Sequence, residues 1–348
     1  TSVSRGLGDV YKRQIYLVFL LFILKPKFVM GTGVGWSATT PLWYTLQASN
    51  KFVHAGIEKE IEYLLNISDT KRNLLKKRIA GRKEAEKELE RKKLKIRKRI
   101  PEVGHDIYLT EEECSLITKS PFNLQRYIAY YKRLWETLQE NNCPYQGVAD
   151  FSNANGWIPP QYLPNIIEQL SVYFDVKALI VVRDPIRRLW SEVNAFYKLH
   201  DEDKLPNFEI YKNLFLERIK GYHQSQYFSI IDKWEKVCPY HVIIMEQLWE
   251  GDEQEKEKQR LSDFLEYDIK NIHTNVYSPD RGPNSPMYFG LKDQWSSDKY
   301  FLPDKLYDQF LQLMPIYQQW VDRYGSLPLY WGKPYNYSAV SLNYLDEL

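Results

Sequence analysis

Long apolar runs that alternate with helix-compatible segments are the main pattern of the chain. The runs Lys177–Val182 and His241–Met245 contain almost no polar positions, which is typical of strands buried on both faces of a sheet. The shorter runs Phe28–Met30 and Gln146–Phe151 indicate two further strands. Strands that alternate with helices over this length predict an α/β fold, a three-layer parallel sheet with helices on both faces.

The segments between the apolar runs have the spacing of amphipathic helices, because apolar residues recur every three or four positions. Pro185 ends one predicted strand and opens a helix that runs through Arg188 to Ser191. We expect the other helices at Thr39 to about Gln47, Pro121–Glu140, Gln161–Tyr173, Tyr227–Lys236 and Arg260–Leu265.

A highly charged helical pattern interrupts this alternation from about residue 69 to residue 100. Between Lys71 and Arg99 there are fifteen Lys or Arg residues and four Glu residues, a local charge of +11. Because the whole chain carries +2, the remainder carries −9. The apolar stripe of this segment is thin, so we expect a solvated helical insertion. The alternative is a docking surface for nucleic acid or an acidic glycan.

The beginning of the chain does not share the pattern of the rest. Thr1–Gln14 is polar and aperiodic, and we leave it out of the fold prediction. Ile15–Leu24 is a run of ten apolar residues, about half of the ~20 that a membrane-spanning helix needs. We interpret it as a short buried segment or a non-native remnant, with a signal-peptide core or a truncated anchor as alternatives. We therefore expect a leader over residues 1–27, whose origin the sequence leaves open. One domain then covers 28–330, with the insertion at about 69–100, and a C-terminal tail covers 331–348.

The composition fits a globular chain with a large core. Of the 348 residues, 44% are hydrophobic and 15% are aromatic, which is enough to bury the core of one large or two smaller domains. The three cysteines, Cys114, Cys143 and Cys238, form no CxxC pair. We interpret them as reduced structural thiols, and we expect no bound metal.

A glycine-rich loop follows the first predicted strand, where residues 31–40 read GTGVGWSATT. Glycines let the backbone approach an anion closely, and the amides at a helix N-terminus point toward it, so the segment predicts a phosphate cradle. It lacks the lysine that precedes Thr39 and Thr40 in the ATPase motif. Trp36 stands where the dinucleotide-binding fingerprint has a glycine. The loop therefore predicts an anionic ligand other than ordinary ATP or NAD.

Two further loops follow predicted strands at the carboxyl edge of the sheet, where open α/β proteins bind ligands. One spans Asp150–Asn155 and the other begins at Arg183. Ser191 lies eight residues after Arg183, about two helical turns later on the same face. A guanidinium and a hydroxyl that converge in this way suit a second phosphate. The alternative is a salt bridge together with a capped helix.

These motifs resemble those of the sulfotransferases that use 3′-phosphoadenosine 5′-phosphosulfate (PAPS). Gly33–Thr40 resembles their 5′-phosphosulfate loop, and Val182–Ser191 is similar to their 3′-phosphate motif, VRDPxxRxxS. Lys59–Leu64 resembles the segment that holds the catalytic glutamate in the glycan-modifying branch. Arg281-Gly282 resembles a late loop that closes over the cofactor. The resemblance covers about Phe28 to Trp320 and implies a P-loop-kinase-like sulfotransferase fold.

The resemblance also implies roles for individual residues. PAPS would bind without a metal, and Glu60 would take the proton from an acceptor hydroxyl or amine. Asp150, in one of the strand-end loops, is a second candidate for the catalytic base or an acceptor ligand. Arg183 and Ser191 would bind the 3′-phosphate, and Arg281 would close over the donor. The implied contacts of the 5′-phosphosulfate are Gly35, Trp36, Ser37, Ala38, Thr39 and Thr40.

Trp36 and Ala38 depart from the family pattern. Trp36 stands where the family has a lysine or arginine at the leaving oxygen, and Ala38 stands in place of a glycine. An indole N–H carries no positive charge, and the loss of a positioned stabilising group lowers a rate by about 10²–10³-fold. Either another cation replaces it, with Arg281, Lys119 and Lys27 as candidates, or the enzyme is slow or is a non-catalytic binding relative.

Together these features predict a sulfotransferase that moves a sulfuryl group from PAPS to a hydroxyl or amine by in-line displacement. The expected acceptor is a carbohydrate or another small hydroxylated molecule rather than nucleic acid. The alternatives are a small-molecule kinase on the same core and a non-catalytic protein that binds a nucleotide or nucleic acid. We expect a cytoplasmic protein, or a membrane-anchored one if Ile15–Leu24 is a truncated anchor.

Overall fold

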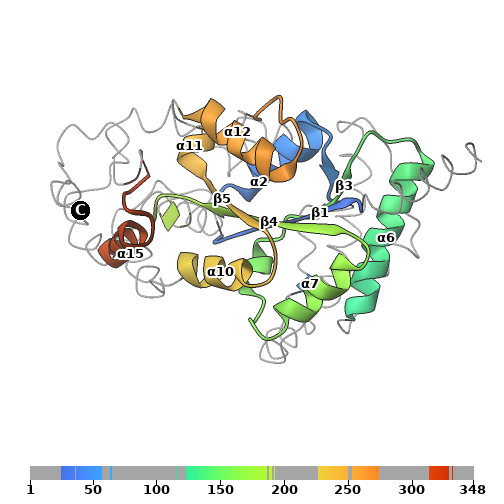
Figure 1. Cartoon of the computed structure of the whole chain (residues 1–348), viewed down its shortest axis with the longest axis horizontal. Helices are drawn as coiled ribbons and strands as arrows, with labels where there is room; N and C mark the ends of the chain where they lie inside the picture. Colours follow the sequence, from blue (N-terminus) through green and yellow to red (C-terminus); the bar gives the residue numbers. More distant parts are fainter. Residues whose placement is uncertain are drawn as a thin grey trace, which may run out of the picture.

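A parallel sheet of five strands, in the order β2-β3-β1-β4-β5, forms the centre of the protein (Figure 1). The computed structural model describes residues 25–35, 37–56, 63–64, 116, 123–185, 188–189, 192, 226–249, 253–273, 313–328 and 331. The predicted parallel α/β sheet is confirmed. The strands are β1 (Lys27–Gly33), β2 (Val53–His54), β3 (Gly147–Asp150), β4 (Asp175–Val182) and β5 (Tyr240–Ile244).

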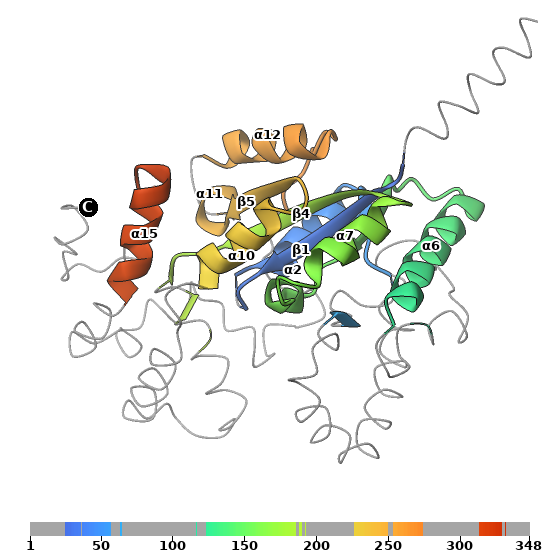
Figure 2. The same ribbon diagram turned by 60° about the horizontal axis from the view of Figure 1, so that its bottom comes forward.

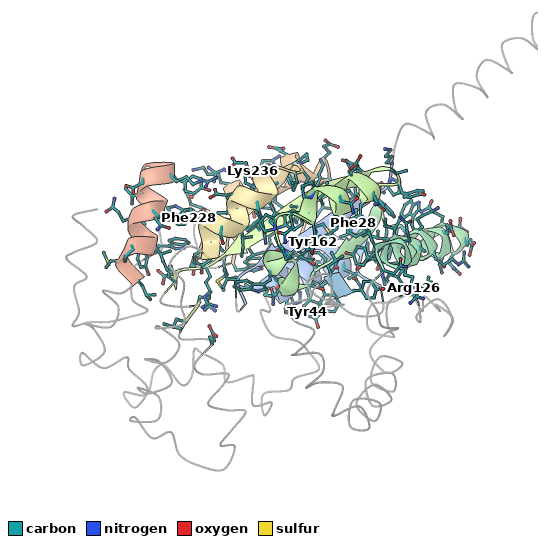
Figure 3. The ribbon with its side chains drawn as sticks, turned by 90° about the horizontal axis from the view of Figure 1, so that it is seen from below. Phe28, Tyr44, Arg126, Tyr162, Phe228 and Lys236 are labelled. Carbon is teal, nitrogen blue, oxygen red and sulfur yellow. The ribbon has the colours of Figure 1, made fainter. Side chains whose placement is uncertain are left out.

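Helices cover both faces of the sheet. Helices α2, α11 and α12 lie on one face, and α7 and α10 lie on the other, with α6 and α15 toward the two ends of the layer (Figures 1 and 2). Phe228 of α10, labelled in Figure 3, packs against Trp320 of α15, and their ring centroids are 6.0 Å apart. The bounds are α2 (Thr39–Tyr44) with its π-helical continuation η1 (Thr45–Ser49), α6 (Leu124–Glu140), the 3₁₀ turn η5 (Asn153–Trp157), α7 (Leu163–Ser171), α10 (Gln226–Glu235), α11 (Met245–Trp249), α12 (Gln254–Leu265) and α15 (Met314–Tyr324).

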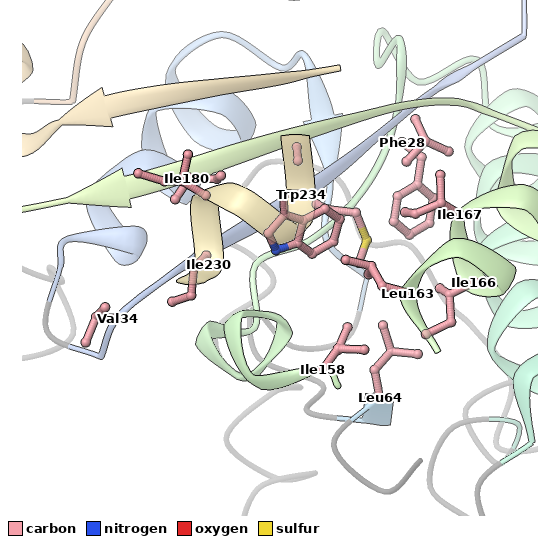
Figure 4. Packing of buried hydrophobic residues seen from close by; sticks show 14 of the residues in the cluster. Phe28, Val34, Leu64, Ile158, Leu163, Ile166, Ile167, Ile180, Ile230 and Trp234 are labelled. Atoms are coloured by element: carbon pink, nitrogen blue, oxygen red, sulfur yellow. The ribbon is translucent and has the colours of Figure 1, made fainter. Parts of the chain in front are cut away.

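The alternation of side chains along the strands fills two separate cores, one on each face. Along β4, Ile180 and Val182 point into the core under α6, α7 and α10, and Leu179 and Val181 point into the core under α2 and α12. Trp234 of α10 is fully buried at the centre of the first core (Figure 4). Because both faces are covered, these strands read as continuous apolar runs in the sequence.

Strand β1 is longer than its apolar run predicted. Gly31, Thr32 and Gly33 belong to the strand and pair in register with Leu179, Ile180 and Val181 of β4. A Cβ atom at Gly33 would lie 2.6 Å from the Val181 carbonyl oxygen, so only glycine allows this close approach of the two backbones. The glycine-rich loop therefore begins at Val34 rather than at Gly31.

The two expected domain boundaries fall on residues that are part of the packed structure. Lys27, which we assigned to the leader, is the first residue of β1 and forms ion pairs with Asp175 and Glu266. Trp331, with which the tail was expected to begin, is buried against α15. The predicted insertion at 69–100, residues 1–24 and residues 332–348 lie outside the described residues. No helix within the described ranges is long and apolar enough to cross a membrane.

Candidate functional site

The carboxyl ends of β1 and β4 form the point of the sheet at which the chain changes direction. These strands are neighbours, but the chain leaves β1 toward β2 at one edge and leaves β4 toward β5 at the other. In open α/β sheets, ligands bind in the crevice outside such a switch point. Both predicted anion loops start here. The fold and this site define the class of the molecule: a parallel α/β protein whose candidate ligand site lies at the topological switch point.

The loop after β1 is a tight turn with a buried hydroxyl. The Ser37 amide donates to the Val34 carbonyl at 3.2 Å, and Ala38 is left-handed, with φ 68° and ψ 30°. Ser37 is 1% exposed, and its Oγ has no hydrogen-bond partner among the described residues. A buried hydroxyl without a protein partner costs free energy unless a ligand or water completes it. This loop therefore has an unmet polar group at the place where an anion was expected.

The loop after β3 is bound to the first turn of α2. Thr39 Oγ1 donates to Asn153 Oδ1 at 2.8 Å, and Thr40 is half-buried in the same turn. Gly156 of η5 lies against the end of β1, because a Cβ atom there would be 3.0 Å from the Gly33 carbonyl oxygen. The structure thus brings together two loops that the sequence predicted separately.

The loop after β4 reaches the loop after β1 through Arg188. Its Nη1 donates to the Gly35 carbonyl at 2.7 Å, and its Nη2 pairs with Glu192 at 2.9 Å. Arg188 is only 3% exposed. In the sequence Arg188 is one position of the motif Val182–Ser191, and that pattern does not predict its contact with the loop after β1.

Arg183 lies in a buried polar cluster at the end of β4. Its Nε is 4.0 Å from Glu246 Oε1, and the same oxygen accepts the Asp184 amide at 3.0 Å. The other Glu246 oxygen accepts the Trp331 indole N–H at 3.0 Å. Tyr227 donates to the Arg183 carbonyl at 2.7 Å. Glu246 has no exposed surface, and the Arg183 guanidinium is the cation that lies beside its carboxylate among the described residues.

Glu246 was missed as a site residue. The signal was present, because a carboxylate follows directly after a predicted strand at the carboxyl edge of the sheet. Its place beside Arg183 depends on the pairing of β5 with β4, which no local sequence pattern specifies.

Asp150, the second candidate base, is the last residue of β3, and both of its carboxylate oxygens accept hydrogen bonds. Its Oδ2 accepts the Tyr127 hydroxyl at 2.7 Å, and its Oδ1 accepts the Ser152 amide at 2.9 Å. Burial raises its pKa, and the hydrogen bonds from Ser152 and Tyr127 offset part of that effect. With no exposed surface, Asp150 shapes the turn after β3. Its role as a base stays a prediction.

A partly buried lysine, which the sequence analysis does not single out, supports the turn after β3. Lys233 of α10 donates to the Gly156 carbonyl and, at 2.9 Å, to the Ile158 carbonyl. Burial lowers its pKa to about 8. Among the described residues no carboxylate pairs with it, and its partners there are the two backbone carbonyls.

Lys27 is too far from the site to replace the missing loop cation. It lies at the first position of β1, and the loop follows the seventh, about 20 Å away at the rise of a strand. Its ammonium is 2.6 Å from both Asp175 and Glu266.

Other predicted residues lie outside the described part of the chain: Trp36, Glu60, Lys119, Ser191 and Arg281.

No protein-family model matches the chain, and no curated protein matches it significantly.

Within the described residues there is no group of three or more His, Cys, Asp or Glu side chains that could hold a metal ion. Cys143 and Cys238 are free thiols.

Proposed function

We propose that the protein is a sulfotransferase that uses PAPS as its donor. The observation that carries the proposal is the convergence of two loops at one switch point. One is a tight loop whose buried Ser37 hydroxyl has no partner among the described residues, and the other bears the buried Arg183 and Arg188. Two adjacent anion sites of this kind suit a donor with a 5′-phosphosulfate and a 3′-phosphate. The motif resemblance supports the same assignment.

In the proposed reaction the acceptor oxygen or nitrogen attacks sulfur in line with the leaving phosphate oxygen. A new bond to sulfur forms, the bond from sulfur to the phosphate oxygen breaks, and adenosine 3′,5′-bisphosphate leaves. The acceptor proton passes to the base, for which Glu60 is the first candidate. Like phosphoryl transfer, the reaction needs mainly positioning and charge stabilisation. The loop after β1 would hold the phosphosulfate and Arg183 would hold the 3′-phosphate.

The acceptor class follows from the resemblance of Lys59–Leu64 to the glycan-modifying branch. We propose a carbohydrate hydroxyl or amine. Incubation with labelled PAPS and a panel of glycans, lipids and phenols identifies it, and transfer only to phenols or lipids would contradict the carbohydrate assignment.

The donor assignment is tested by the affinities of adenosine 3′,5′-bisphosphate and ADP, measured by titration calorimetry. The bisphosphate should bind at least tenfold more tightly. Equal binding, or preference for ADP, would contradict the proposal and favour a kinase-like nucleotide site.

Arg183→Lys is the matched variant for the 3′-phosphate. An alanine would leave the buried carboxylate of Glu246 without its cation, which typically destabilises a protein by about 3–5 kcal/mol. A lysine keeps the charge but not the planar fork, so the preference for the bisphosphate should fall while cooperative melting remains. The control is Arg133→Lys, at a partly exposed ion pair of α6, which should leave the preference unchanged.

A further inference from the structure

The guanidinium of Arg188 is a physical link between the two candidate anion loops. The main chain of Arg188 is anchored in the loop after β4, because the Arg188 amide donates to the Asp184 carbonyl at 2.8 Å. The Nη1 atom of its guanidinium donates a hydrogen bond of 2.7 Å to the Gly35 carbonyl, which lies 153 positions away in the chain. With 3% of its surface exposed, the group is held in one geometry and shielded from solvent.

A charged donor on the Gly35 carbonyl has two consequences for the loop after β1. Hydrogen bonds of a charged group are about twice as strong as neutral ones, so this contact fixes the Gly35 peptide plane. In addition, a carbonyl oxygen that pointed at an anion would repel it. The oxygen that Arg188 holds is turned toward the guanidinium instead. The conformation of the loop after β1 therefore depends on a residue of the loop after β4.

We propose that Arg188 is a positioning residue that couples the two anion loops. Binding of the 3′-phosphate by Arg183 stabilises the arrangement in which Arg188 contacts Gly35, and this arrangement keeps the Gly35 peptide in the conformation that accepts the 5′ group. By thermodynamic linkage the 5′ group must strengthen binding of the 3′-phosphate by the same factor. This inference rests on the proposed function, because it concerns the same donor site.

Four ligands measure the coupling: adenosine, adenosine 5′-phosphate, adenosine 3′-phosphate and adenosine 3′,5′-bisphosphate. The coupling factor is the gain in affinity from the 5′-phosphate when the 3′-phosphate is present, divided by that gain when it is absent. Allosteric couplings typically lie between about 5-fold and 150-fold, and we expect about 10-fold for the wild-type protein. Calorimetry or ligand-observed NMR gives the four dissociation constants.

Substitutions at Arg188 should remove the coupling rather than only weaken binding. Arg188→Met should bring the factor to about 1, and Arg188→Lys, which loses the fork that spans Gly35 and Glu192, should lower it at least threefold. Glu192→Gln is the matched control, because it leaves the Arg188 bond to Gly35 in place, and its factor should stay near the wild-type value. A purely structural role would lower all four affinities alike and leave the factor unchanged.

The outcomes separate this inference from the proposed function. Additive binding in the wild-type protein overturns the inference. So does a factor within twofold of wild type in Arg188→Lys, or in Arg188→Met where that variant melts cooperatively. In each case the preference of the wild-type protein for the bisphosphate over ADP remains as separate support for the donor assignment. If that preference is absent, the proposed function itself fails, whatever the coupling.

Discussion

Thr39 Oγ1 donates a hydrogen bond of 2.8 Å to Asn153 Oδ1 and so joins the first turn of α2 to the turn after β3. The two residues are 114 positions apart in the chain, and Thr39 is buried. Thr39→Val, which keeps the shape but removes the hydroxyl, should lower the free energy of unfolding by about 1 kcal/mol.

Thr39→Ser is the control for this prediction, because it keeps the hydroxyl and loses only a methyl group. Urea denaturation of both variants measures the difference. If the serine variant lost as much stability as the valine variant, the methyl contact and not the hydrogen bond would hold the two turns together.

Ala38 stands in a backbone conformation that favours glycine. Its φ of 68° and ψ of 30° are left-handed, which costs a residue with a Cβ atom about 1–2 kcal/mol. Ala38→Gly removes this strain. It also increases the entropy of the unfolded chain, which lowers the free energy of unfolding by about 0.4–1 kcal/mol. We therefore expect a net stabilisation of up to about 1.6 kcal/mol in thermal or urea unfolding.

Ala48→Gly is the matched control for Ala38→Gly. Ala48 is exposed in the π-helical turn that follows α2, where glycine should destabilise by about 0.5–1 kcal/mol. The two substitutions are chemically identical, so opposite signs would assign the effect of position 38 to its backbone conformation. Destabilisation at both positions would show that Ala38 is not strained.

Elements with a strong local signal were predictable from the sequence. The predicted ranges of β4, α6 and α10 begin and end within a few residues of the observed bounds. β4 was indicated by its apolar run, and the two helices by their helical spacing. The two-residue strand β2 was missed because two residues carry no periodicity. β1 was drawn too short because Gly31–Gly33 pair through their backbones and show no apolar side chain.

The candidate site was predictable only as separate loops. Glycines, Arg183 and the strand ends could be read from the sequence, since each is a local pattern. The contact of Arg188 with Gly35 and that of Glu246 with Trp331 depend on which strands are neighbours. Neighbouring strands are a property of the whole sheet, and no local pattern specifies them.

The role of Asp150 can be separated from that of Glu60 by amide substitutions. Asp150→Asn keeps one oxygen for the Ser152 amide and places an N–H on the Tyr127 hydroxyl, which can accept it. We expect a change of less than about 1 kcal/mol in stability and turnover within a few-fold of wild type. Glu60→Gln should lower turnover by about 10²–10⁴-fold if Glu60 is the base.

Turnover of labelled PAPS with the best acceptor from the panel measures both variants. Loss of turnover in Asp150→Asn at unchanged stability would assign the base to Asp150. Unchanged turnover in Glu60→Gln would exclude Glu60.

The partly buried ammonium of Lys233 should make the stability of the protein depend on pH above neutrality. Burial lowers its pKa from 10.5 to about 8. Between these two values the unfolded chain binds a proton that the folded protein has released, so the free energy of unfolding rises with pH in this window. Below pH 8 the residue is charged in both states and contributes no slope.

Lys233→Met removes the titrating group, and the stability of the wild-type protein minus that of the variant should therefore increase from pH 8 to pH 10.5. The measurement is urea denaturation at intervals across this range. Lys236→Met, at an exposed lysine just beyond the end of α10 (Figure 3), is the control and should keep the wild-type slope. An equal slope in Lys233→Met and the wild-type protein would mean that the amine at Gly156 and Ile158 titrates as it does in the unfolded chain.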